Sequence, residues 1–320
     1  MKKIFATLML AALAFSSCIK EDDSYKDLLP VQPGQYIYTY VTTQDRVAMQ
    51  AANVGMRVAV LAAEVAKQRA EGDQNVNVSN VIYYSQKVLS RLFNAGTKIE
   101  EIEEGYLLTF DKGFQMPDYF YAEGSVLVRT NGSPELIEGA TWQVEMKPDF
   151  KLYSYSSYGG AESQVNMLSG TTTITANADR TYTIQISNIA SSVEGNEWGP
   201  SDWSSSSTGF VVSPEDEDVT LAYSSCAGKA FKIEGSASGS SIYGNVYGTS
   251  PLRMSYRVTD GLYIGTQIVS GTQECEFTSP LDYDNTAYPA PDVRVVYTFD
   301  ESSRRYSYKI YYNGYVYPKE

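Results

Sequence analysis

The sequence predicts an α+β fold in which an N-terminal helical hairpin packs on a large antiparallel β meander, either a curved sheet or a sandwich. Two observations predict this class. Apolar residues recur every three or four positions over residues 44–94, which is the period of an amphipathic helix. From Thr97 onward the period changes to two, and turn-forming residues separate short segments. We therefore expect a single domain over 44–320, with a helical hairpin at 44–96 and a β region at 97–320.

The predicted hairpin consists of two helices joined by a polar turn. The first helix covers 44–70, and Gly72 follows it as a helix-ending residue. The second helix covers about 80–94 and ends before Gly96. An isolated hairpin of this size buries too little apolar surface to be stable, so we expect its apolar face to pack on the β region.

The β region contains ten segments in which apolar and polar residues alternate, as they do in half-buried strands. These segments are 106–110, 125–130, 142–146, 171–175, 181–186, 219–223, 230–234, 252–258, 292–299 and 305–312. Turn-forming pairs such as Asn131-Gly132 and Asn313-Gly314 lie between segments and predict antiparallel hairpins. The Ser/Gly-rich tract at 191–209 is the candidate boundary if this region divides into two domains.

The composition excludes several classes of function. The chain has 320 residues and no histidine, which excludes Ser-His-Asp catalysis and His-ligated zinc or haem. Its three cysteines are too few for a four-cysteine metal site. The 25 Lys+Arg and 38 Asp+Glu give a net charge of −13, which argues against nucleic acid as a partner. We expect no cofactor.

Residues 1–17 have the organisation of a secretory signal peptide, and Cys18 follows directly. Lys2 and Lys3 precede an apolar stretch that is too short to cross a bilayer core of ~30 Å as a helix. This segment resembles the signal peptide of a bacterial lipoprotein. The resemblance implies that Cys18 is lipidated and becomes the mature N-terminus. The alternative is an ordinary secretory signal in which Cys18 has no such role.

Residues 18–43 are predicted to be a tether between the lipid and the folded domain. The run Lys20-Glu21-Asp22-Asp23 resembles the export tag of Bacteroidota lipoproteins, which implies a location on the outer face of the outer membrane. The alternative is a solvated linker, which is the usual role of a short charged run. Acyl chains on Cys18 would anchor the protein, because each buried CH₂ group contributes about 0.8 kcal/mol.

Trp198, Asp202 and Trp203 are the candidate ligand contacts, in a stretch rich in Gly, Pro and Ser that is typical of a loop. Indole rings can stack on sugar rings while neighbouring carboxylates accept hydrogen bonds from the sugar hydroxyls. Tryptophan side chains can also anchor a protein partner. The alternative is that both tryptophans are buried in the core of the sheet, because tryptophan is highly buried on average.

Two further groups of residues are candidate sites. Cys226 and Cys275 can form a disulfide worth roughly 3–4 kcal/mol in an oxidising compartment, or can be two separate buried thiols. The acidic runs at 215–218 and 282–285 lack the pattern of an EF-hand and are more typical of solvated turns, so we predict no metal site.

These observations favour a non-catalytic lipoprotein of the outer membrane, at the cell surface, that binds a glycan or an envelope protein partner. One alternative is a glycan hydrolase that uses two carboxylates, although no pair is fixed by the sequence. The other is an adhesin-like structural subunit that pairs the edges of its sheet with other subunits.

Overall fold

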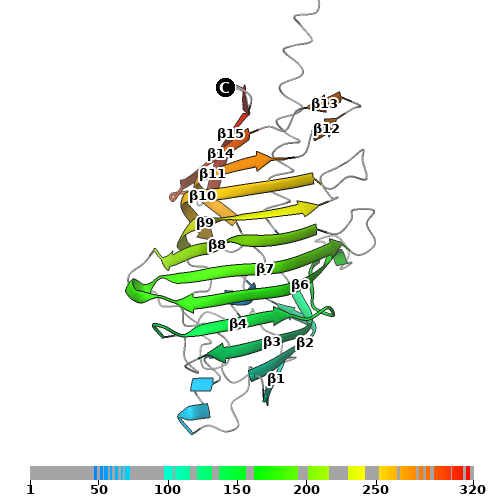
Figure 1. Cartoon of the computed structure of the whole chain (residues 1–320), viewed down its shortest axis with the longest axis vertical. Coiled ribbons are helices and arrows are strands. Elements are labelled where there is room, and N and C mark those ends of the chain that lie inside the picture. Colours follow the sequence, from blue (N-terminus) through cyan, green and yellow to red (C-terminus); the bar gives the residue numbers. More distant parts are fainter. Residues whose placement is uncertain are drawn as a thin grey trace, which may run out of the picture.

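The computed structural model describes part of the segment 47–72 and most of the chain from 97 to 317. Between 97 and 317 the residues outside the description are 104, 116–120, 132–136, 156–161, 194–200, 216–229, 242–251, 265–266, 279–280, 284–285, 289–291, 304 and 313–314. The described strands form one fourteen-stranded antiparallel sheet and one small two-stranded sheet (Figure 1).

The large sheet is a meander, since nearly every strand pairs with its neighbours in sequence. Its order is β1 (Thr97–Ile102), β2 (Gly105–Gln115), β3 (Tyr121–Asn131), β4 (Thr141–Met146), β6 (Glu162–Ala176), β7 (Tyr182–Val193), β8 (Ser201–Pro214), β9 (Ala230–Ser241), β10 (Leu252–Ile264), β11 (Gln267–Phe277), β14 (Asp292–Asp300), β15 (Arg305–Tyr312) and β16 (Tyr315–Tyr317). The short β5 (Lys151–Tyr155) pairs with β3 and β6 beyond the end of β4. The small sheet contains β12 (Leu281–Tyr283) and β13 (Thr286–Tyr288).

The predicted α+β class with an N-terminal helical hairpin is wrong. The described residues are 76% strand, and their helical residues lie only within 47–70 and in the short 3-10 turn η1 (Ala178–Arg180). The second predicted helix, at about 80–94, lies outside the described residues. Several strands also extend beyond the predicted segments. In β6, β9 and β10 a glycine lies near the point where the predicted alternation of apolar and polar residues stops.

Gly170 in β6 illustrates this interruption. Alternation predicted a strand only over 171–175, whereas β6 begins at Glu162. The register with β7 shifts between Ser169 and Thr171, and Gly170 lies at this bulge with a φ of +119°. A β-bulge of this kind bends its strand and increases the local twist, and glycine adopts the required backbone conformation without steric cost.

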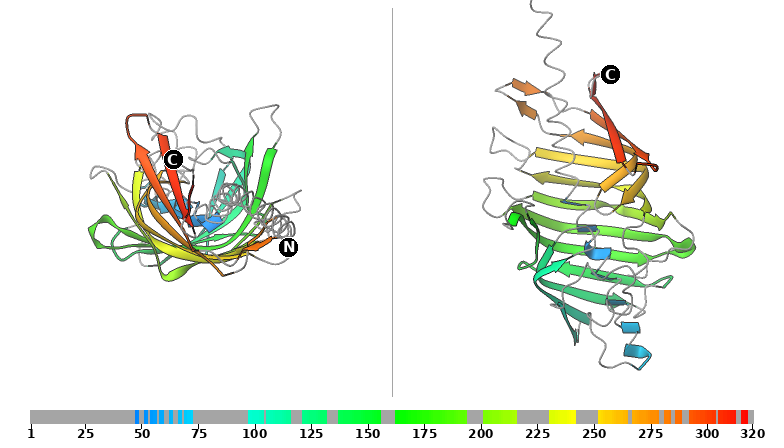
Figure 2. Two further views of the ribbon diagram at one scale, coloured as in Figure 1. Left: turned by 90° about the horizontal axis from the view of Figure 1, so that it is seen from above. Right: turned by 180° about the vertical axis from the view of Figure 1, so that it is seen from behind.

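The large sheet curves into a trough, and the helical residues of 47–70 lie on its concave side (Figure 2). Ala51, Gly55, Val58 and Ala62 in this segment are all buried. Side chains from the inward-facing positions of the strands complete a continuous hydrophobic core that reaches from Leu108 on β2 to strand β15. The outward-facing positions are mostly Ser, Thr, Gln or charged residues, so the convex face is polar.

Within the described part of the chain, no helix has both the length and the apolar character needed to cross a membrane.

Candidate functional site

Trp203 lies inside the sheet core. Its sequence context had predicted a loop instead. It belongs to β8, only 1% of its surface is exposed, and it contacts Tyr256 of β10 with 5.9 Å between ring centroids. Its indole N–H has no hydrogen-bond partner among the described residues. The alternative of a core tryptophan is therefore the correct one for Trp203, while Trp198 lies outside the described residues.

The intervening strand β9 makes room for these rings. Its inward-facing positions include Gly235, Ala237 and Gly239, which are small or lack a side chain. Gly239 lies directly opposite Trp203 in the pairing of β8 with β9, and a Cβ atom there would overlap the indole ring. Aromatic rings from both neighbouring strands thus cover the backbone of β9. They fill the space that larger side chains on β9 would otherwise occupy.

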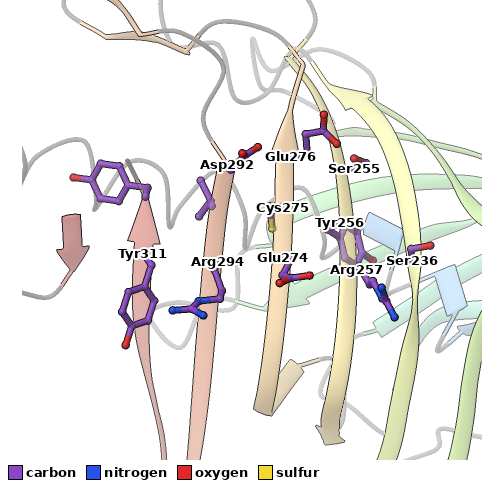
Figure 3. A pocket seen from close by; sticks show the side chains of 12 residues that line it. Ser236, Ser255, Tyr256, Arg257, Glu274, Cys275, Glu276, Asp292, Arg294 and Tyr311 are labelled. Atoms are coloured by element: carbon purple, nitrogen blue, oxygen red, sulfur yellow. The ribbon is translucent and has the colours of Figure 1, made fainter. Parts of the chain in front are cut away.

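The opposite, convex face of the same strands carries a polar row that we call the arginine row. It consists of Ser236, Arg257, Glu274, Arg294 and Tyr311, which are direct cross-strand partners from β9 to β15. Alternation of side chains places them on one face of the sheet, and Arg257, Glu274 and Arg294 lie side by side across three strands (Figure 3). The charges alternate in sign, which is favourable between direct cross-strand neighbours.

A second polar row lies two residues further along each strand. We call it the serine row, and it consists of Ser204, Ser238, Ser255, Glu276 and Asp292. The small hydroxyls occupy β8 to β10, and the two carboxylates face each other across β11 and β14. Small side chains on one part of the row and large charged ones beside them leave the surface hollowed.

The arginine row lines a hollow of about 660 Å³ on this face, together with Ser255, Glu276 and Asp292 of the serine row. The guanidinium carbon of Arg294 lies 4.4 Å from the centroid of the Tyr311 ring, which is a cation–π arrangement. The guanidinium of the exposed Arg294 therefore lies against the ring at this end of the hollow.

A second hollow, of about 480 Å³, adjoins the first and shares Ser255 with it. Asp202, Ser240 and Arg253 line it, and they are successive cross-strand partners on β8, β9 and β10. Of the two predicted ligand contacts that the structure describes, Asp202 therefore reaches a hollow on the convex face, whereas the Trp203 ring packs in the core.

The two hollows present hydroxyls, carboxylates and guanidinium groups over one continuous surface. This set can both donate and accept hydrogen bonds from a polar ligand. Among the described residues, no three Asp, Glu or Cys side chains are placed to hold a metal ion. The chemistry available in this described area is therefore hydrogen bonding, ionic pairing and stacking on Tyr311.

Of the three cysteines for which the sequence predicts a role, only Cys275 lies in the described part of the chain. Cys275 lies on β11, and its side chain is buried in the hydrophobic core. Cys226 and the predicted lipidation site Cys18 both lie outside the described residues, so the disulfide and the lipid remain predictions.

Sequence reasoning missed the arginine row because its members come from five strands that are far apart in the chain. The alternation in 252–258 and 292–299 did place Arg257 and Arg294 on the polar side of their strands. Only the register of the sheet, which the sequence did not fix, makes them neighbours of Glu274.

Comparisons with protein-family models, with curated proteins and with solved structures found no match to this chain.

Proposed function

We propose that this chain is a non-catalytic binding protein of the bacterial cell envelope, and that the convex face of β8–β15 binds a glycan. The observation that carries the proposal is the pair of adjoining hollows that share Ser255. Together they provide an elongated surface that carries hydroxyls, carboxylates and guanidinium groups, which suits a ligand of several linked sugar units.

The lining residues support a glycan in particular. Sugar hydroxyls pair well with carboxylates and guanidinium groups, and these alternate along the arginine row. Tyr311 offers an aromatic ring at one end of the larger hollow, and the guanidinium of Arg294 lies 4.4 Å from its centroid. Aromatic rings stack on the apolar faces of sugars, while the surrounding polar groups select their hydroxyl pattern.

The predicted lipid on Cys18 would place this binding face at the outer membrane. A tether of the length of 18–43 would allow the sheet to stand away from the lipid surface. The net charge of −13 favours such separation, because an anionic membrane surface repels it. Metabolic labelling with a fatty acid tests this part of the proposal: wild type should carry the label and Cys18→Ala should not.

Glycan binding is tested by screening the purified chain on a glycan array and then measuring the affinity for the best ligand by calorimetry. Arg294→Ala and Tyr311→Ala should each weaken binding by about tenfold or more, because truncating a residue that anchors a ligand typically costs about 1.4 kcal/mol or more. Lys232→Ala is the matched control, because Lys232 is exposed on the same face of β9 but does not line either hollow.

Unchanged affinity in both hollow variants would contradict the proposed site. The hydrolase alternative can be tested on the same bound glycan. Its candidate carboxylates are Glu274, Glu276 and Asp292, which all line the larger hollow. Release of new reducing ends from the bound glycan, abolished by Glu276→Gln or Asp292→Asn, would show that the face is catalytic and would overturn a purely binding role.

A further inference from the structure

We propose that the glycan bound by this face carries both an acidic group and a free amino group, which different rows of the larger hollow hold. This inference rests on the glycan-binding role proposed above and specifies the charge of the ligand. Five charged residues line the hollow, and all of them are exposed: Arg257, Glu274, Glu276, Asp292 and Arg294. A ligand that occupies the hollow must therefore replace the water around these charges.

None of these five residues forms an ion pair with another residue of the described chain. On β3 and β4 of the same sheet, by contrast, Glu145 is paired with Arg129 at 2.7 Å. In the hollow, Arg257 and Glu274 are direct cross-strand partners, yet their charged groups do not pair. A ligand can therefore contact these groups without first breaking an ion pair within the protein.

The two signs of charge dominate different rows. In the arginine row, Arg257 and Arg294 lie on either side of Glu274, so positive charge is in excess. In the serine row, the charged members are Glu276 and Asp292, which are both negative. The two rows are two residues apart along each strand, which corresponds to about 7 Å. An acidic group and an amino group on one sugar unit, or on neighbouring units, can span this separation.

The carboxylates of the serine row suit an ammonium group. Glu276 and Asp292 are direct cross-strand partners, and like charges in this position are unfavourable. An ammonium group between them would relieve the repulsion and donate charge-assisted hydrogen bonds to both carboxylates.

The guanidinium groups of the arginine row suit an acidic group. A guanidinium can donate two parallel hydrogen bonds to a carboxylate, a sulfate or a phosphate. The guanidinium of Arg294 lies beside the Tyr311 ring, on the side away from Glu274 (Figure 3). A sugar unit whose acidic group binds Arg294 would therefore have an aromatic ring next to it on which to stack.

Glycans of uniform charge fit this hollow less well. A neutral glycan would displace water from five charged groups and provide no opposite charge in return. A glycan with acidic groups alone would meet the carboxylates of the serine row, and the net charge of −13 of the chain would repel it. A glycan with amino groups alone would place them against the arginines. Only a ligand with both groups compensates both rows.

The test uses one tetrasaccharide of alternating glucosamine and glucuronic acid in four forms. Its amines are either free or acetylated, and its carboxyl groups are either free or reduced to alcohols. Calorimetry at neutral pH measures the affinity of the purified chain for each form. The form with both charges should bind about tenfold more tightly than either singly charged form, because hydrogen bonds to charged groups typically contribute that much. The neutral form should bind most weakly.

Two variants test which row holds which group. Arg294→Gln should remove the advantage of the free carboxyl groups and keep that of the amines, and Glu276→Gln should do the reverse. Lys232→Gln and Glu234→Gln are the matched controls, because both residues are exposed on β9 and line neither hollow. Each control should preserve both advantages.

Equal affinity for all four forms would overturn the charge assignment and leave glycan binding intact. The assignment is also overturned if the doubly charged form keeps its full advantage in both Arg294→Gln and Glu276→Gln. If none of the four forms binds while other glycans on the array do, the inference fails and the proposed function stands. If no glycan binds at all, both fail. The comparison of the four forms needs only wild type, so it decides the inference even where a variant does not fold.

Discussion

Thr172 of β6 donates a hydrogen bond from its side-chain Oγ1 to the backbone carbonyl oxygen of Ala51, at 2.9 Å. Both residues are fully buried, and the bond joins the helical segment to the concave face of the sheet. Gly55, one helical turn later, faces the same threonine, and a Cβ atom at this glycine would overlap the Thr172 side chain. The close approach of helix and sheet therefore depends on a hydroxyl on one side and a missing side chain on the other.

The hydrogen bond predicts the effect of Thr172→Val. Valine keeps the shape of threonine but cannot donate, so the free energy of unfolding should fall by about 1 kcal/mol, the typical net value of a buried hydrogen bond. Chemical denaturation measures this change. Thr173→Val is the matched control, because Thr173 is the next residue of β6 and faces the convex side. An equal loss in both variants would contradict the role assigned to the bond.

Gly55→Ala should destabilise the protein, although the same change stabilises most helices by about 0.5–1 kcal/mol. The added methyl group would overlap Thr172, and overpacking of this kind costs about 1–3 kcal/mol. Unfolding by denaturant gives the sign directly. The double variant Gly55→Ala with Thr172→Gly removes the obstructing side chain, so the two changes should cost less together than the sum of the single losses. Strict additivity would show that the two residues do not pack against each other.

Gly239→Ala should displace the indole of Trp203. The new methyl group would overlap that ring, so we expect a loss of about 1–3 kcal/mol in the free energy of unfolding and a shift in tryptophan fluorescence. Ser238→Ala is the control on the same strand, since this residue is exposed on the opposite face. A Gly239→Ala variant with the stability and emission of wild type would mean that the ring does not lie over β9.

The hairpin turn between β14 and β15 predicts a pH effect. Hydrogen bonds from the hydroxyl and backbone N–H groups of Ser302 and Ser303 lower the pKa of Asp300 from 3.8 to about 2. Because the pKa in the folded state is depressed, the stabilising contribution is complete above pH 3.8 and is lost as the pH falls through 2.

Removing this carboxylate should therefore make the stability of the folded protein depend less on pH between pH 4 and 2. The melting temperature of Asp300→Asn should depend less on pH in this window than that of wild type or of Glu301→Gln, which removes a charge from the neighbouring turn position. NMR titration of the Asp300 carboxyl group checks the pKa itself. An ordinary titration midpoint near 3.8 would contradict the turn geometry.

Strand prediction succeeded where apolar and polar residues alternate without interruption. The segments 142–146 and 292–299 lie in β4 and β14, where buried and accessible positions alternate along most of the strand. It failed for β8, which begins in the tract proposed as a boundary. Serines and Gly209 give Ser201–Pro214 little intrinsic preference for a strand, yet β8 pairs with β7 and β9 in the middle of the sheet. Pairing with two neighbours outweighs local propensity at such a position.

The amino-acid sequence by itself excluded catalysis and metal binding that need histidine, and it determined the β character of the chain after Thr97, because these depend on composition or on a local period. The anchor at Cys18 stays a prediction. Tertiary structure decided that Trp203 is buried and that Arg257, Glu274 and Arg294 are neighbours. The reason is physical: a strand shows which residues share a face, but only its register against other strands, set by the bulges and by packing across the whole sheet, decides which of them meet.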